Sequence, residues 1–229
     1  MKRLAIFVEG YTEQVFILKL LAKLAQQRIV AFEIKSQKFG ILTTIRRSPL
    51  TNPDWYILIV NCNTDNQVKT KIIESYSSLC LLGYDCIIGI RDIFPKQHKD
   101  IERLEKNLMS GLPSGNIPIL IHLAILEIES WFIEEISHFQ RVDARLTHQV
   151  IAANGFDYER VNAADIPYPA ETLDRIYQLV GKTYGKTKAD IHRTIEALDF
   201  DAMTNAVRKK ASSLHQVLNS IENTLDLTA

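Results

Sequence analysis

The stretch LAIFVEGYTEQVFILKLLAKLA, residues 4–25, decides the fold class. Its first part, Leu4–Val8, is a short continuous apolar run that ends at Glu9 and Gly10, which predicts a buried strand. The apolar-rich stretch Val15–Ala25 is too long for a strand and predicts a well-buried helix. A buried strand followed at once by a buried helix is the repeating unit of an α/β sheet.

The same alternation continues along the first half of the chain. Further strands are predicted at Ile29–Ile34, Tyr56–Val60, Cys86–Ile90 and Ile117–Ile125, and helices at Lys69–Leu82, Lys96–Met109 and Glu127–Ile136. Continuous apolar strands are typical of a mostly parallel sheet with helices on both faces. After Ser137 the strand patterns stop. We therefore predict a Rossmannoid α/β domain over residues 1–135 and a helical C-terminal region over residues 136–229 packed on it.

Composition excludes several classes of protein. The chain has 229 residues, of which 46% are hydrophobic and 24% charged, so it is neither disordered, nor collagen-like, nor a small disulfide-stapled domain. Lysine plus arginine equals aspartate plus glutamate, 27 each, so no overall basic charge points to nucleic acid. Residues 1–115 carry a net charge of +5 and residues 116–229 a net charge of −5. This asymmetry suggests two surfaces with different tasks, although chance also explains it.

Cysteine usage and the N-terminus indicate the compartment. The three cysteines, Cys62, Cys80 and Cys86, have no CxxC spacing, which favours reduced thiols in a cytoplasmic protein. The apolar run at the N-terminus is only five residues long before Glu9 interrupts it, and no 18-residue apolar span follows. We expect a soluble, cytoplasmic protein without a membrane partner.

Acidic residues follow three of the predicted strands. Glu9 follows the first strand, Asp92 the fourth, and Glu127 and Glu129 the fifth. In open α/β sheets, ligands bind at the carboxyl ends of the strands. Hard carboxylate oxygens suit Mg²⁺ or Mn²⁺, ions that drive phosphodiester chemistry. Any one of these acids alone is more often a helix cap or a surface charge, but the set together predicts a metal site.

Four segments resemble Toprim proteins. They are FVEGYTEQVFILKLL at 7–21, IIGIRDIFP at 87–95, EIESWFIEE at 127–135 and YPAETLDRIYQLVGKTYGKTKADIHRTIEALDF at 168–200. The first resembles the opening of a Toprim domain and the second the strand that carries the Toprim DxD motif. The third and fourth resemble an uncharacterised Toprim-like family that is related to the overcoming-lysogenization-defect nucleases.

The resemblance implies a Toprim-like fold with a divalent-metal site. Glu9 matches the Toprim glutamate, a general base or metal-site acid, and Asp92 matches the first Asp of DxD, a metal ligand. The second Asp of the motif falls on Phe94, so this strand would present one carboxylate and one ring to a metal. Either Glu127 or Glu129 would supply the missing ligand, or metal binding is weakened or lost. Glu129 matches the family's acid best.

A cationic segment in the C-terminal half completes the implied site. Lys186 matches a lysine of the Toprim-like family and would steady the charge of the scissile phosphate. The surrounding GKTYGKT, residues 181–187, is one residue short of a P-loop and follows no predicted strand, so we interpret it as a loop or helix end.

Two functions follow from these motifs. The first is a Mg²⁺- or Mn²⁺-dependent endonuclease-like protein acting on DNA or RNA, in defence against phage or plasmids, with a partner ATPase encoded nearby. The alternative is a Toprim module that has lost catalysis and serves as a nucleic-acid- or protein-binding subunit, for which Phe94 is the motivation. The sequence leaves the oligomeric state open.

Overall fold

The computed structural model describes residues 1–229 except 50, 65–66, 94–100, 125, 158–160 and 228–229. The chain forms two compact units. The α/β unit comprises Met1–Asp92, Lys99–Leu123 and Gln216–Ala229, and the helical unit comprises Ile93–His98 and Ala124–His215. Each is described by itself below. The division at residue 135 stays a prediction from the sequence.

The α/β unit is built on one sheet. Its strands are β1 (Lys2–Val8), β2 (Val30–Lys38), β3 (Ile41–Arg47), β4 (Trp55–Asn61), β5 (Cys86–Asp92) and β6 (Ile119–Ala124), in the spatial order β3-β2-β4-β1-β5-β6. β1 runs parallel to β4 and β5, and β2 runs parallel to β4, whereas β3 is antiparallel to β2. The predicted α/β fold with a mostly parallel sheet and flanking helices is confirmed.

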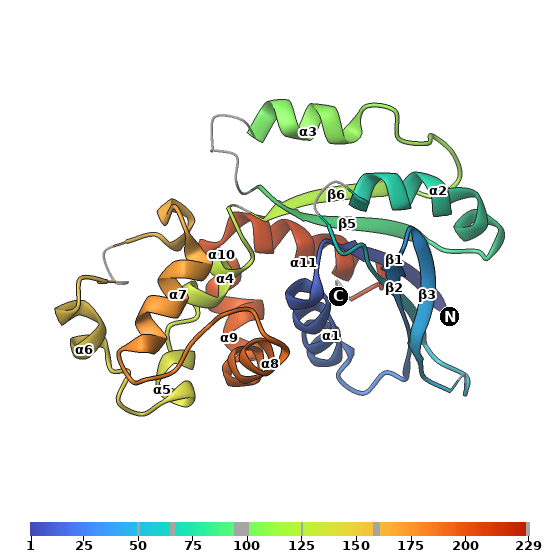
Figure 1. Ribbon diagram of the computed structural model, residues 1–229. Helices are drawn as coiled ribbons and strands as arrows, with labels where there is room; N and C mark the ends of the chain where they lie inside the picture. The colour runs from blue at the N-terminus through green and yellow to red at the C-terminus, as the bar shows by residue number, and fades with distance from the viewer. Residues whose placement is uncertain (50, 65–66, 94–100, 125, 158–160, 228–229) are drawn as a thin grey trace. The chain divides into compact units, whose positions relative to one another are not determined.

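Helices cover both faces of this sheet. The helices of the unit are α1 (Tyr11–Ala25), α2 (Gln67–Leu81) and α3 (Ile101–Met109). Figure 1 shows α2 and α3 on one face and α1 on the other. Val68, Ile72 and Leu79 of α2 pack on Phe7 and Leu58 of the sheet. Strands buried on both faces must be apolar at every position, which is why β1 and β4 appear as continuous apolar runs in the sequence.

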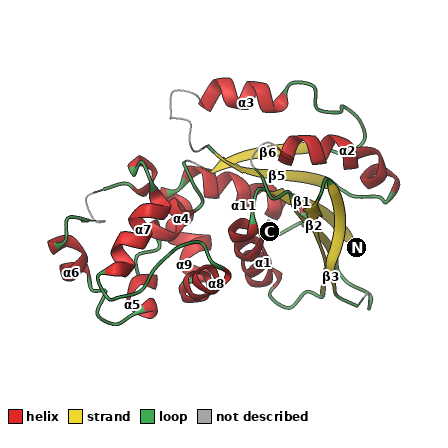
Figure 2. Cartoon of the chain, viewed as in Figure 1, coloured by secondary structure: helices red, strands yellow, loops and turns green. Residues whose placement is uncertain are grey.

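The helical unit contains short helices (Figure 2). They are α4 (Glu129–Glu134), α5 (His138–Val142), α6 (His148–Ala153), η2 (Ala163–Asp165), α7 (Pro169–Gln178), α8 (Lys188–Ala197), α9 (Phe200–Ala202), the π-helical turn η3 (Met203–Val207), α10 (Arg208–Lys210) and the start of α11 (Ser212–Thr224). Beyond Ser137 the described residues contain no strand, as predicted. Trp131 is the expected core residue: it is 1% exposed and its Nε1 donates to Ser213 Oγ at 2.9 Å.

One strand was not predicted. The edge strand β3 ends at Arg46 and Arg47, and the sequence pattern predicted no strand in this segment. All but one of its seven residues are exposed, so β3 has no buried face and therefore no apolar run to mark it as a strand. The predicted helix Lys96–Met109 is described only as α3 from Ile101, because residues 94–100 lie outside the described residues.

Two further observations concern the core. His122 Nε2 and Ser220 Oγ form a hydrogen bond at 2.8 Å, and burial lowers the pKa of His122. Cys62 and Cys86 are buried packing residues. Among the helices that the structure describes, none combines the length and the apolar character needed to cross a bilayer.

Candidate functional site

The carboxyl edge of the sheet carries a buried ion pair. Glu9 follows β1 directly, and Arg91 is the next-to-last residue of β5, one register position beyond the pair Val8 and Ile90. Arg91 Nε lies 3.2 Å from Glu9 Oε1, and the side chains are 13% and 8% exposed. We call Glu9 and Arg91 the sheet-edge pair. A buried ion pair of this kind is weak evidence of stabilisation, because the cost of removing both charges from water offsets their attraction.

The sheet-edge pair lies at a topological switch point. The chain leaves β1 toward β2 on one side of the sheet and leaves β5 toward β6 on the other. Where neighbouring parallel strands send their connections in opposite directions, a crevice opens at their carboxyl ends and ligands bind there. Glu9 and Arg91 sit at the ends of the two strands that border this position.

Polar groups of α1 and β4 surround the same edge. The Glu13 carboxylate accepts from Gly10 N at 2.9 Å, and Asn61 Nδ2 donates to Gln14 Oε1 at 3.2 Å. Glu13, Gln14 and Asn61 are each at most 5% exposed. Gly10 has extended backbone angles rather than the sharp turn expected for it. A Cβ there would lie 3.0 Å from Glu13 Oε2, so the glycine leaves room for the capping carboxylate.

Asp92, the predicted metal ligand of the fourth strand, is the last residue of β5 and is partly buried. It directly follows Arg91, so it faces the opposite side of the strand from that side chain. Phe94, the residue at the second position of the DxD-like motif, lies outside the described residues. The role of Asp92 and the consequence of Phe94 therefore stay predictions.

The helical unit contains a second acidic centre. Lys186 Nζ lies 3.2 Å from Glu127 Oε1 and 3.1 Å from Glu129 Oε1. Tyr184 Oη donates to the same Glu129 oxygen at 2.9 Å. We call Glu127, Glu129, Tyr184 and Lys186 the glutamate–lysine centre. It joins the start of α4 to a loop more than fifty residues further along the chain.

The two glutamates of this centre differ in environment. Glu127 Oε2 accepts from Ala170 N at 3.0 Å, so this carboxylate caps the first turn of α7 while it pairs with Lys186. Glu129 is completely buried, and its Oε2 has no hydrogen-bond partner. Burial raises the pKa of Glu129; Lys186 opposes the shift and Glu127 reinforces it. A buried, unpartnered carboxylate oxygen is the mark of a site whose ligand or proton is still to be supplied.

Local structure fixes Lys186 in position. The Asp190 carboxylate accepts from Gly185 N at 3.1 Å and from Thr187 Oγ1 at 2.7 Å, and Thr187 in turn caps α8. Lys186, between these two residues, has φ = 52°, a left-handed conformation that a lysine rarely adopts. Strained backbone of this kind concentrates at functional sites. The segment 181–187 is the loop we expected rather than a P-loop, because it follows α7 and not a strand.

Other cations of the C-terminal half are mostly held by acids. Lys182 lies 3.9 Å from Asp143, and Arg193 lies 3.0 Å from Asp190. Lys210, in the basic run at 208–210, pairs with Glu134 at 3.0 Å. These pairs give the three cations local structural roles.

The carboxylates of these two centres could hold a divalent ion only if water and substrate supply the remaining ligands. Carboxylate oxygens suit Mg²⁺ and Mn²⁺, and Glu129 Oε2 is a buried oxygen that lacks a partner. Within the described part of the chain, no group of three or more His, Cys, Asp or Glu side chains is placed to hold a metal. Mg²⁺ is commonly held by one or two carboxylates, with water and substrate phosphate completing the shell. Glu127 with Glu129 would fit that mode, and Glu9 or Asp92 would each fit it as a single carboxylate ligand; none of them forms an all-protein cage within the described residues.

Sequence reasoning found part of these two centres. The structure brings Glu127, Glu129 and Lys186 together and places Glu9 at the edge of the sheet. The convergence of all four acids on one metal stays a prediction. Arg91 and Tyr184 were missed as site residues: Arg91 neighbours Asp92 at a strand end, which could have marked it, whereas nothing near Tyr184 in the sequence marks its contact with a residue 55 positions away.

Comparisons with known proteins place the chain in a family. Residues 8–219 match the family model described as "Domain of unknown function (DUF4276)". No curated protein matches the chain. Among solved structures, a "putative cell surface hydrolase" from Lactobacillus plantarum WCFS1 matches at 10% identity with a TM-score of 0.32, over 60% of this chain and 57% of that one. The match spans little more than half of that protein and is too distant to bear on function.

Proposed function

This chain belongs to the DUF4276 family, and we propose that it is a divalent-metal-dependent, nuclease-like protein of Toprim type that cleaves nucleic-acid phosphodiesters. The observation that carries the proposal is the buried pair of Glu9 and Arg91 at the switch point of a parallel sheet. The Toprim resemblance of the strand-end motifs adds to it.

The sheet-edge pair has the chemistry that phosphodiester hydrolysis needs. Arg91 carries a planar guanidinium, the group best suited to phosphate oxygens. Glu9 lies beside it, so a water molecule attacking a phosphate bound at Arg91 would find a carboxylate within reach to take its proton. The low exposure of both side chains strengthens their interaction with a bound charge, since the local dielectric is below that of water.

The candidate metal ligands are Glu9 and Asp92, which face opposite sides of the sheet at its carboxyl edge, and the neighbouring acids Glu127 and Glu129 of the helical unit. When bound, Mg²⁺ or Mn²⁺ would activate water and neutralise phosphate charge. Lys186, whose side chain is 41% exposed, keeps its ammonium between two carboxylates and solvent. We assign it the task of contacting a phosphate oxygen.

A second function has its own support. Arg91 already pairs with Glu9, and Lys186 already pairs with both Glu127 and Glu129, so each acid centre has a cation of the chain beside it without a metal. No three-ligand group exists among the described residues. This internal pairing favours the alternative of a catalytically degenerate Toprim module that binds nucleic acid or protein.

A cleavage assay separates the two functions. The purified chain is incubated with Mn²⁺ and labelled single-stranded DNA, duplex DNA or RNA. We expect cleavage of at least one substrate, and a loss of about 100-fold or more in Glu9→Gln, because a general base contributes about that much or more. Glu105→Gln, which replaces an exposed carboxylate on α3 of the same unit, is the control and keeps the wild-type rate.

Two outcomes would overturn the nuclease proposal. One is an intact protein that leaves every substrate uncut in Mn²⁺. The other is cleavage that Glu9→Gln and Lys186→Met leave at the wild-type rate, since this would trace the activity to another site or to a contaminant. Calorimetric titration with Mn²⁺ then tests the metal: binding that Glu9→Gln and Asp92→Asn both abolish supports the sheet edge as the metal site, and unchanged binding excludes it.

A further inference from the structure

The hairpin formed by β2 and β3, residues 30–47, has an unusual turn. The turn residues are Phe39 and Gly40, with φ values of 50° and 80°. Two positive φ values define the tight hairpin turn that strongly prefers Asn-Gly, because bulky side chains are strained there. Phe39 instead puts an aromatic ring at this position, and the ring is fully exposed, at 103% relative exposure. The turn is therefore strained in its backbone, and the ring of Phe39 is exposed to solvent instead of being buried.

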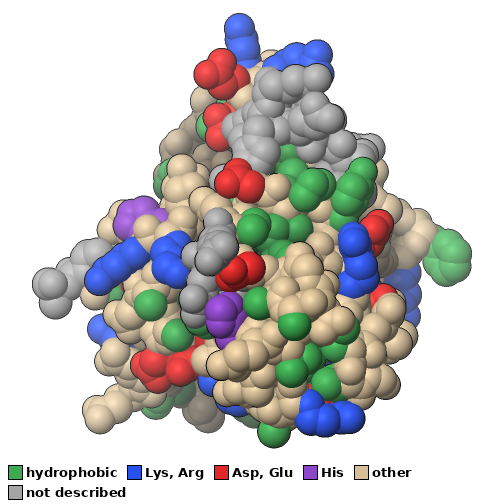
Figure 3. Space-filling model, turned by 90° about the vertical axis from the view of Figure 1, so that its left-hand side faces the viewer, with side chains coloured by type: hydrophobic (Ala, Val, Ile, Leu, Met, Phe, Trp, Pro, Cys, Tyr) green, Lys and Arg blue, Asp and Glu red, His purple; other side chains and the backbone are tan. Residues whose placement is uncertain are grey.

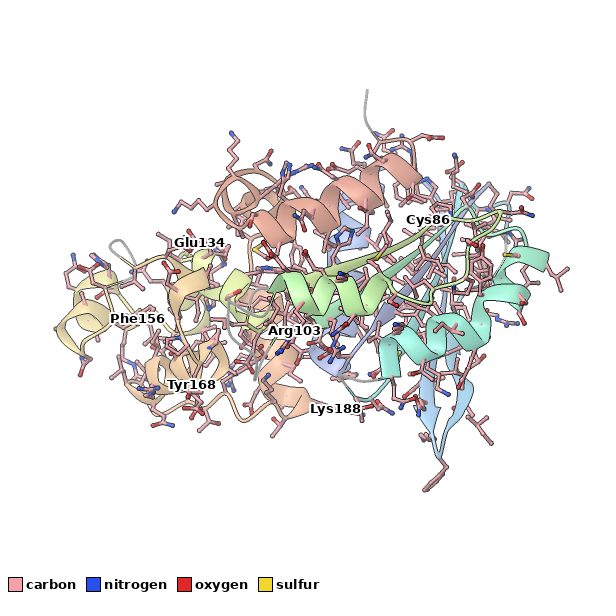
Figure 4. The ribbon with its side chains drawn as sticks, turned by 90° about the horizontal axis from the view of Figure 1, so that it is seen from above. Cys86, Arg103, Glu134, Phe156, Tyr168 and Lys188 are labelled. Carbon is pink, nitrogen blue, oxygen red and sulfur yellow. The ribbon has the colours of Figure 1, made fainter. Side chains whose placement is uncertain are left out.

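The tip of the hairpin is held in place. Lys71 of α2, only 5% exposed, donates from Nζ to Gly40 O at 2.9 Å. On the neighbouring strand end, Asn63 donates from Nδ2 to Gln37 O. Phe39 is therefore presented on a fixed support and not on a loose loop. Figure 4 shows the pale-blue hairpin projecting at the edge of the sheet.

The hairpin is basic. Residues 30–47 contain Lys35, Lys38, Arg46 and Arg47 against the single acid Glu33. Arg47 and Lys35 contact Glu33 at 2.7 and 3.7 Å. Lys38 and Arg46 are exposed and form no ion pair with any described residue. By contrast, basic and acidic side chains are interspersed on the face shown in Figure 3.

The hairpin tip lies at the same edge of the sheet as Glu9. β2 is parallel to β4, with Ser36 opposite Asn61, and Asn61 lies opposite Val8 of β1. The strand residues after Ser36 therefore extend past the row where β1 ends and Glu9 begins. Two strand spacings, about 10 Å, separate β2 from β1 across the sheet. A chain bound at the sheet-edge pair could reach the tip of the hairpin.

We infer that the β2–β3 hairpin is a binding element for single-stranded nucleic acid, in which Phe39 stacks on an unpaired base and Lys38 and Arg46 contact phosphates. This inference rests on the proposed function and names its substrate class. Aromatic rings interleaved with cations are how proteins hold single strands without reading their sequence, because every base offers a stacking face. The exposed side chains of Ile41 and Ile45 add apolar surface beside the ring.

The charge of the hairpin argues against a second copy of this chain as the occupant. β3 is an edge strand, and exposed edges can pair with another chain. Two such hairpins side by side would bring together two surfaces of the same sign. A polyanionic strand is instead attracted by the same charges.

Fluorescence anisotropy with a fluorescein-labelled, mixed-sequence 30-nucleotide single-stranded DNA, in EDTA, tests the inference. We expect Phe39→Ala and Phe39→Asn to weaken binding by about 10-fold, the size of one lost stacking contact. Phe39→Asn should also raise the thermal unfolding midpoint, because asparagine suits the turn. A variant that is more stable and yet binds less tightly excludes misfolding as the cause.

The cations have their own measurement and controls. Lys38→Gln with Arg46→Gln should reduce the slope of log affinity against log salt by about 1.4, since each phosphate contact on a single strand contributes about 0.7. Leu81→Ala and Lys19→Gln are matched controls, because Leu81 is 89% exposed on α2 and Lys19 is exposed on α1. Both should bind like wild type.

Three results would overturn the inference: wild-type affinity in the Phe39 variants, no binding of the single strand by wild type, or a duplex of the same sequence bound more tightly with the same dependence on Phe39. A wild-type dimer in sedimentation that Phe39→Asn dissolves, with unchanged DNA affinity, would assign the hairpin to self-association instead.

Binding in EDTA is independent of cleavage. If binding depends on the hairpin but no cleavage depends on Glu9, this inference holds and the nuclease proposal is refuted. If cleavage depends on Glu9 but binding does not depend on the hairpin, the nuclease proposal holds and this inference is refuted.

Discussion

Replacement of Glu33 by glutamine tests the electrostatics of the hairpin base. The Glu33 carboxylate is 4% exposed and accepts hydrogen bonds from Tyr56 Oη at 2.5 Å, Arg47 Nη2 at 2.7 Å and Thr44 Oγ1 at 2.9 Å. These donors belong to β4 and β3, so one carboxylate on β2 ties three strands together. Glutamine keeps the shape of the side chain but replaces one acceptor oxygen with a donor.

The magnitude follows from the pKa of Glu33. Burial opposes ionisation, but the hydrogen bonds from Tyr56, Arg47 and Thr44 outweigh it and lower the pKa from 4.5 to about 2. At about 1.4 kcal/mol per pKa unit, ionised Glu33 contributes about 3 kcal/mol to the free energy of unfolding at pH 7. Because the folded pKa is depressed, this contribution is complete above pH 4.5 and is lost as the pH falls toward 2. At pH 3 about 1.4 kcal/mol of it remains.

Urea unfolding of wild type and Glu33→Gln at pH 7, 5, 4 and 3 measures this contribution. The difference in free energy of unfolding between the two proteins should be about 3 kcal/mol at pH 7 and about half of that at pH 3. Comparison of the two proteins at each pH removes the titration of the other carboxylates. Glu105→Gln, which replaces an exposed acid on α3, is the control and should change stability by less than about 0.5 kcal/mol at any pH. A gap that stays constant from pH 7 to pH 3 would refute the reasoning.

Three more predictions concern other parts of the chain. Lys186→Met should lower the free energy of unfolding by about 1–3 kcal/mol at pH 7.5, because it leaves the buried Glu129 uncompensated. Burial raises the pKa of Glu129, so this loss of stability should become smaller as the pH is lowered from 7.5, and urea midpoints measured over a pH series check this. Glu127→Ala should lower the free energy of unfolding by about 1 kcal/mol, because it removes the carboxylate that accepts from Ala170 N at the start of α7. Glu127→Gln keeps an acceptor for Ala170 N, so the same urea measurement should show a smaller loss. At pH 8 a thiol reagent should modify only Cys80 in the folded protein and all three cysteines in urea, because Cys62 and Cys86 are buried and burial raises the pKa of Cys62 to about 12; fast labelling of Cys62 in the folded state would contradict its burial.

The sequence predicted the parts of the fold that are buried on both faces. β4 is buried throughout and β1 is buried after its first two residues, so their apolar runs define them without tertiary information. β3 escaped prediction for the opposite reason: its side chains are exposed, and only its pairing with β2 makes it a strand. Edge strands owe their existence to neighbours that a local pattern cannot reveal.

In the candidate site, too, the sequence revealed some residues, whereas others depend on tertiary contacts. Acids directly after strands can be placed at the carboxyl edge from the order of the elements alone, which is how Glu9 and Asp92 were found. The partners of those acids depend on register and packing. Arg91 meets Glu9 because β1 and β5 are neighbours in the sheet, although two helices and three strands lie between them along the chain. The contact of Tyr184 with Glu129 needs a loop conformation fixed by Asp190, which no spacing rule encodes.

The topology also explains why the hairpin tip and the sheet-edge pair lie at the same edge of the sheet. Parallel strands β2, β4, β1 and β5 all end at the same edge, so any extension of β2 projects over the region where Glu9 and Arg91 lie. Glu33 fixes the base of that extension and Lys71 fixes its tip. A strained Phe39 turn is tolerable only on such a support, because a loose hairpin would relax the turn and fold the ring away from solvent. The buried carboxylate of Glu33 therefore supports the hairpin that carries the exposed ring of Phe39. The ring lies at the same carboxyl edge of the sheet as Glu9 and Arg91.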